Sequence, residues 1–156
     1  MIKKFDIKLI ILECVALIFI ISGIKRLYFA YNGTIFNALT EEDWKMYEAL
    51  TDMYASQFLD NQSYWILAAM LIGILVIGLI NWKNNFGIIN SIAVLILTVG
   101  IAMTGFYTTG IVNKYLNYFC GIFAEKYGTA FLIGGLMIFF VGILILWKTI
   151  SLYKTR

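Results

Sequence analysis

The chain of 156 residues contains no histidine and no proline, and only 13% of its residues are charged. The lack of histidine excludes catalytic systems with an imidazole base, imidazole metal ligands and histidine-ligated haem. Its two cysteines, Cys14 and Cys120, form neither a C-x-x-C motif nor a disulfide framework. The sequence also lacks a P-loop, a glycine-rich dinucleotide turn and the H-E-x-x-H motif. These absences predict a protein that is not an enzyme and that carries no cofactor and no metal.

Hydrophobic residues, by contrast, make up 62% of the chain. A soluble domain of this length buries only about two-thirds of the surface that its unfolded chain exposes, so its interior cannot hold so much apolar surface. No run of lysine and arginine is long enough to form a basic patch for nucleic acid or lipid. The composition predicts an integral membrane protein whose main partner is the lipid bilayer and that binds no nucleic acid.

A bilayer core of about 30 Å requires about 20 apolar helical residues, and four stretches meet this length. They predict an all-α fold in which residues 1–156 form a single transmembrane domain, an integral membrane four-helix bundle with two outer amphipathic helices. The predicted spans are residues 7–24, 64–82, 86–107 and 129–147, and the outer segments are residues 25–63 and 108–128. The short turn at residues 83–85 predicts a tight antiparallel hairpin between the two middle spans.

Basic residues predict the orientation, because cytoplasmic loops carry more lysine and arginine than outer loops. With the N-terminus inside, the cytoplasmic side holds Lys3, Lys4, Lys8, Lys83, Lys148, Lys154 and Arg156, and the outer side holds Lys25, Arg26, Lys45, Lys114 and Lys126. This distribution predicts a cytoplasmic (cell) membrane protein with both termini inside. Lys25 and Arg26 oppose the trend, and we expect their long side chains to snorkel to the headgroups. The isoleucine-, lysine- and asparagine-rich composition indicates a bacterial source.

The outer segments contain two stretches of aromatic residues at helical spacing. In the first, Thr40 precedes an acidic turn as a helix N-cap would, which predicts a helix over residues 41–59. Its apolar face would carry a candidate partner surface, namely Trp44, Tyr47, Tyr54 and Phe58. The second stretch covers residues 111–123. Each helix would rest on lipid or on the bundle; a docking surface for a partner protein and an aromatic ligand pocket are the alternatives.

Glu13 is the one carboxylate deep in a predicted span, about six residues or 9 Å from its start. An ionisable group in this position is a functional hypothesis by default. Glu13 shares a helix face with Gly23, and small residues mark helix contacts, so we expect it to face the bundle. Asn90 and Ser91 lie at a similar depth on the third span. Together the three form a candidate intramembrane polar site, which is a structural clamp, a proton or cation site, or an intersubunit contact.

The stretch from Leu17 to Lys25 resembles the first span of the DoxX-like family, which reads roughly L-x-F-hydrophobic-x-S-G-x-x-K. The layout of four spans with both termini inside is similar to that family too. The chain differs from the family in its longer first outer segment, in lacking a Glu-x-x-Gly-Gly signature in the second span, and in the offset of its lysine, which directly precedes Arg26. The resemblance implies a small membrane protein linked to redox systems, and it transfers no functional residue.

Three functions follow from these observations. The leading prediction is a non-enzymatic accessory or interaction subunit, with a membrane protein or further copies of itself as partner. The first alternative is a channel or transporter protomer in which Glu13 is the intramembrane polar element. The second alternative is a membrane redox partner of the DoxX-like type.

Overall fold

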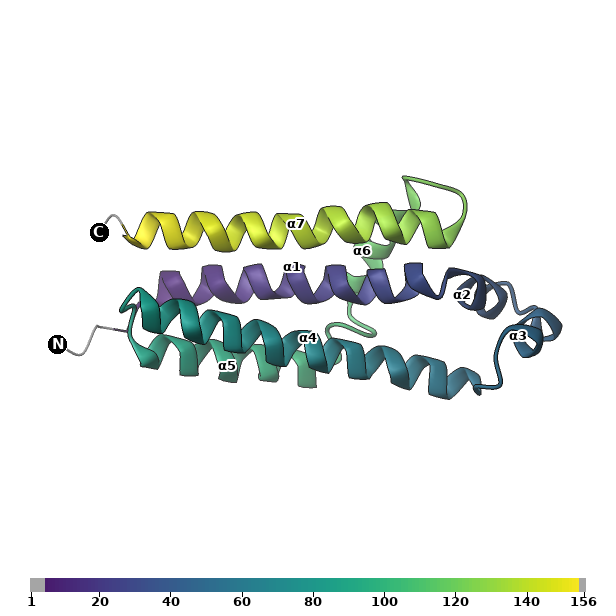
Figure 1. Cartoon of the computed structure of the whole chain (residues 1–156), viewed down its shortest axis with the longest axis horizontal. Helices are drawn as coiled ribbons and strands as arrows, with labels where there is room; N and C mark the ends of the chain where they lie inside the picture. The colour runs from purple at the N-terminus through teal and green to yellow at the C-terminus, as the bar shows by residue number, and fades with distance from the viewer. Residues whose placement is uncertain (1–4, 155–156) are drawn as a thin grey trace.

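The computed structural model describes residues 5–154, and this part of the chain contains seven helices and no strand (Figure 1). The helices are α1 Ile7–Tyr31, α2 Gly33–Thr40, α3 Trp44–Leu50, α4 Ala55–Lys83, α5 Ile88–Met103, α6 Ile111–Gly121 and α7 Tyr127–Lys154. The prediction of an all-helical fold is therefore confirmed. Lys3, Lys4 and Arg156, which contribute to the predicted orientation, lie outside the described residues.

Three helices, α1, α4 and α7, are long enough and apolar enough to cross a membrane. This finding supports a location in a membrane. The fourth apolar helix, α5, has 16 residues and is shorter than these three. At 1.5 Å per residue it is about 24 Å long.

The helices differ in length from the predicted spans. The first and last extend past residues 24 and 147 to Tyr31 and Lys154, and α4 begins at Ala55, before residue 64. Hydropathy marks only the apolar part of each helix, whereas backbone hydrogen bonding continues through the polar turns beyond it. Helix α5, which corresponds to the third predicted span, is shorter than predicted and ends at Met103. Gly105 there has a φ of +72°, a left-handed conformation that cannot continue an α-helix.

The single outer helix predicted over residues 41–59 is not formed. Glu42 has a φ of +55° and separates α2 from α3. The N-cap of α3 is Asp43, whose carboxylate accepts a hydrogen bond from the backbone N–H of Met46 at 3.0 Å, so the predicted cap at Thr40 is wrong. The extended conformation of Thr51 ends α3, and the rest of the predicted helix belongs to α4. The helix boundaries in this segment are thus set by the cap and by the non-helical residues, and not by the spacing of the aromatic residues.

Helix α1 lies at the centre of the bundle, with α7 on one side and α4 and α5 on the other (Figure 1). The start of α1, the turn between α4 and α5 and the end of α7 lie at one end of the bundle, and α2 and α3 lie at the other. Helix α6 packs against α7. One apolar core surrounds the first half of α1, and an aromatic core lies between its second half, α4, α6 and α7.

Candidate functional site

The carboxylate of Glu13 is fully buried at the contact of α1, α4 and α5. Its Oε2 accepts a hydrogen bond of 3.1 Å from Nδ2 of Asn81, on α4. The same Nδ2 also donates to Oγ of Ser91, on α5, over 3.1 Å. One polar chain thus connects the three helices, and the expectation that Glu13 faces the bundle agrees with its burial. We call Glu13, Asn81 and Ser91 the polar clamp.

Two oxygen atoms of the polar clamp lack partners. Within residues 5–154, neither Oε1 of Glu13 nor Oδ1 of Asn81 accepts a hydrogen bond. A buried polar atom without a partner costs about 1–3 kcal/mol, and more if its group is charged. These two oxygen atoms can therefore accept a further hydrogen bond, either from a proton on Glu13 itself or from a donor group outside the clamp.

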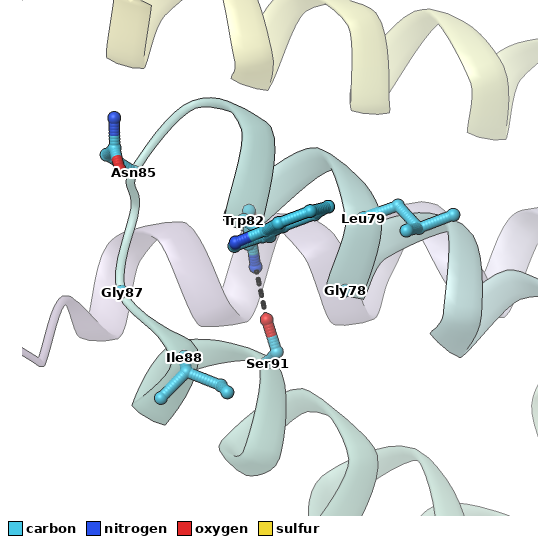
Figure 2. A pocket seen from close by; sticks show the side chains of 8 residues that line it. Gly78, Leu79, Trp82, Asn85, Gly87, Ile88 and Ser91 are labelled. Carbon is cyan, nitrogen blue, oxygen red and sulfur yellow. Dashed lines mark hydrogen bonds between the residues drawn. The ribbon is translucent and has the colours of Figure 1, made fainter.

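A groove of about 790 Å³ lies against the polar clamp, between α4 and α5 next to their turn. It is lined by Gly78, Leu79, Asn81, Trp82, Asn85, Gly87, Ile88 and Ser91. The hydrogen bond to Ser91 crosses from α4 to α5 beside the ring of Trp82, with Ile88 near the same opening (Figure 2). Trp82 and Ile88 are largely exposed. The groove thus has apolar walls and a polar floor, the usual character of a binding pocket.

Asn90 does not join the polar clamp, although the sequence placed it at a similar depth. It is fully buried, and its Oδ1 accepts a hydrogen bond from the backbone N–H of Asp6 at 3.0 Å. Its Nδ2 donates to the carbonyl of Phe86. Asn90 therefore fixes the start of α1 to the start of α5. Sequence reasoning missed Asn81 as a site residue, and the signal was a carboxamide near the end of an otherwise apolar span.

The four residues of the predicted partner surface do not lie on one surface. Trp44 is 51% exposed and Tyr54 is 76% exposed, whereas Tyr47 and Phe58 are buried. Phe58 belongs to α4 and packs in the aromatic core. The hydroxyl of Tyr47 has no hydrogen-bond partner within the described range, and burial raises its pKa above the ordinary value.

A second polar cluster involves Lys25 and Arg26 near the far end of α1. Both side chains are buried, so they do not snorkel outward as the sequence suggested. Lys25 Nζ donates to the carbonyl of Tyr107 at 2.6 Å and to Oδ1 of Asn113 at 3.1 Å. Arg26 Nη2 donates to the carbonyl and to Oδ1 of Asn113, at 3.0 and 3.2 Å, and to Oδ1 of Asn117 at 2.7 Å.

This cluster fixes α6 and the loop before it to α1, and every hydrogen-bond acceptor in it is neutral. Burying a charge without a counter-charge costs several kcal/mol even after relaxation. The sequence signal was a pair of adjacent basic residues within an apolar helix. The sequence analysis interpreted this pair as snorkelling side chains, and their burial shows that this interpretation is wrong.

No protein-family model matches this chain, and no curated protein and no solved structure matches it at a significant level. The resemblance to the DoxX-like family stays a prediction. Functional inference therefore depends on the two buried polar clusters and the groove.

Proposed function

We propose that this chain is a four-span integral membrane protein that acts as a non-enzymatic interaction subunit. In this proposal the groove between α4 and α5 receives a transmembrane helix of another membrane protein. The observation that carries the proposal is Asn81, a residue that lines the groove and whose buried Oδ1 accepts no hydrogen bond within residues 5–154. Both termini and the turn between α4 and α5 would face the cytoplasm.

The contacts at the two ends of α5 support its role as the fourth span. Near its start, Asn90 bonds to the backbone of Asp6, just before α1. The loop after its end reaches Lys25 through the carbonyl of Tyr107. The 19 residues of α1 from Ile7 to Lys25 are separated by 18 helical steps and cover about 27 Å, close to the thickness of a bilayer core. The segment from α5 through this loop thus runs beside α1 over that distance.

The chemistry of the groove favours a protein partner over lipid. Large apolar side chains are exposed on both helices beside the groove, among them Leu79, Trp82, Ile88 and Ile92. Acyl chains would cover these side chains equally well, but they carry no hydrogen-bond donor for Asn81. A partner helix with a serine, threonine or amide side chain supplies one, and such interhelical hydrogen bonds contribute to helix association in membranes.

Photo-crosslinking in intact membranes tests this proposal. A benzophenone side chain in place of Leu79 is expected to capture one discrete protein, and Ser91→Ala is expected to weaken the capture. A benzophenone in place of Phe140, which is similarly exposed on α7, is the matched control and should not give the same adduct. An adduct of twice the chain mass would identify a second copy as the partner. Lipid adducts alone from both positions would refute the proposal.

Oε1 of Glu13, which has no hydrogen-bond partner among the described residues, favours a second candidate function, a channel or transporter protomer in which this carboxylate carries a proton or cation. Glu13→Gln separates the two functions because it keeps the shape and removes the titrating group. An interaction subunit should keep its crosslink at position 79 with unchanged or higher stability, since the amide can donate where the carboxylate only accepts. Loss of a measured ion or proton flux in reconstituted vesicles, with crosslink and fold retained, would instead establish the transport function.

A further inference from the structure

The buried cluster of Lys25 and Arg26 has no negatively charged partner in the described part of the chain. Within residues 5–154, its hydrogen-bond partners are carbonyl and carboxamide oxygens and the thiol of Cys120, and no carboxylate pairs with either cation. The Nε–H of Arg26 donates no hydrogen bond at all in this range, although Arg26 is fully buried. Burial raises the pKa of the neighbouring Cys120 thiol, although Arg26 opposes this shift, so the thiol does not supply the missing anion.

The position of the missing anion is marked by the carboxamide of Asn113. Its Oδ1 lies 3.1 Å from Nζ of Lys25 and 3.2 Å from Nη2 of Arg26, so one oxygen atom contacts both cations. Asn113 is also in the first turn of α6, where the unpaired backbone N–H groups of a helix add positive potential. Two basic side chains therefore meet at one oxygen atom, close to the N-terminal turn of a helix.

We propose that Lys25 and Arg26 form a binding site for a phosphate group, carried by an anionic lipid headgroup or free in solution. The Nε and Nη2 edge of a guanidinium matches two oxygens of a phosphate, and an ammonium supplies a further point charge. The carboxamide oxygens of Asn113 and Asn117 occupy the cluster when no phosphate is bound. Asn117 is only partly buried, and it forms the rim that a phosphate displaces.

The place of the cluster along the bundle suits a lipid headgroup. Lys25 contacts Tyr107, in the loop that follows the end of α5, about 27 Å along α1 from Ile7. This is near one boundary of a bilayer core if the chain has the four spans proposed above. The lipid source rests on that arrangement, whereas a site for free phosphate does not depend on it.

Binding to the purified full chain in a neutral detergent tests the site. The probes are phosphatidylglycerol, diacylglycerol with the same acyl chains, and inorganic phosphate, each measured by native mass spectrometry and by thermal stabilisation. We expect phosphatidylglycerol to bind at least about tenfold more tightly than diacylglycerol. A single hydrogen bond to a charged group contributes enough free energy for about a tenfold change in affinity. If inorganic phosphate binds and competes with phosphatidylglycerol, the source is free phosphate; if only the lipid binds, the source is the headgroup.

Two variants and a control assign the binding to the cluster. Arg26→Gln is expected to weaken binding at least about tenfold. Lys114→Gln, which neutralises an exposed lysine on α6, should leave it unchanged. Asn117→Ala removes a competing oxygen and should tighten binding, a result that does not depend on the folding of the arginine variant. Equal affinity for phosphatidylglycerol and diacylglycerol with no response to phosphate, or equal binding by wild type and both variants, would overturn the proposal.

Discussion

The close approach of α1 and α7 makes Gly142→Ala the most informative single substitution. A Cβ atom at Gly142 would lie 2.7 Å from Cγ1 of Ile20, 2.8 Å from the backbone oxygen of Ala16 and 2.8 Å from the backbone nitrogen of Ile20. Two of these atoms belong to the backbone of α1, so no rotamer change can relieve the contact. The two helices must move apart, which would also loosen the packing at Gly23, where a Cβ atom would lie 2.7 Å from Cβ of Phe139 on α7.

The size of the effect follows from two opposing terms. Overpacking a well-packed interface costs about 1–3 kcal/mol, whereas alanine is favoured over glycine in a helix by about 1 kcal/mol. Gly78→Ala is the matched control, because a Cβ there has no atom within 4 Å. This variant gains the helix propensity of alanine without a steric cost, so its free energy of unfolding should stay level or rise by up to about 1 kcal/mol. The difference between the variants isolates the steric term, about 1–3 kcal/mol.

The assay is reversible unfolding in mixed micelles with increasing sodium dodecyl sulfate, followed by circular dichroism. Gly142→Ala should unfold at a lower fraction of the denaturing detergent than wild type, and Gly78→Ala at an equal or higher fraction. Two variants that shift the midpoint in the same direction by the same amount would refute the close packing of α1 against α7.

Three further predictions concern the topology and the outer part of the bundle. Single cysteines at Asn84 and Asp52, in a chain without native cysteines, should be labelled by a membrane-impermeant reagent from opposite sides of the membrane; labelling from one side would contradict the four-span arrangement. Phe58→Ala should lower the free energy of unfolding by about 3–5 kcal/mol, because it empties a fully buried site, whereas Trp44→Ala, at a half-exposed position, should change it by well under half as much. Tyr47→Phe removes a buried hydroxyl that has no hydrogen-bond partner among residues 5–154, so the midpoint of unfolding should stay level or rise; a clear loss of stability would show that this hydroxyl has a partner.

The polar residues show where prediction from sequence succeeded and where it stopped. The burial of Glu13 was predictable, since a carboxylate inside an apolar helix must avoid lipid, and its link to Ser91 on the third apolar stretch follows the expected depth. Asn90 lies at the same depth as Ser91 and is also polar, yet its side chain accepts a hydrogen bond from the backbone N–H of Asp6 instead of joining Glu13. Depth along a span is a one-dimensional quantity, and the rotation of each helix decides which polar groups meet.

The aromatic residues of the first outer segment illustrate a second limit. Helical spacing placed Tyr47 and Phe58 on one face with Trp44 and Tyr54. The helical conformation is interrupted at Glu42 and again after Leu50. Phe58 therefore belongs to α4 and is buried there. Periodicity reports a face only within one continuous helix, and a left-handed residue or an extended one ends that continuity.

The sequence by itself determined the helical class and the apolar helices suited to a membrane, because hydropathy and the cost of unpaired backbone groups in lipid are local properties of each segment. It also predicted that Glu13 faces the bundle, whereas for Lys25 and Arg26 it predicted side chains that snorkel to the headgroups. Only the tertiary structure decided which residues form hydrogen bonds with these three side chains. Asn81, Asn113 and Asn117 are far from them in sequence, and long-range pairing depends on how the helices rotate and cross, which no single segment encodes.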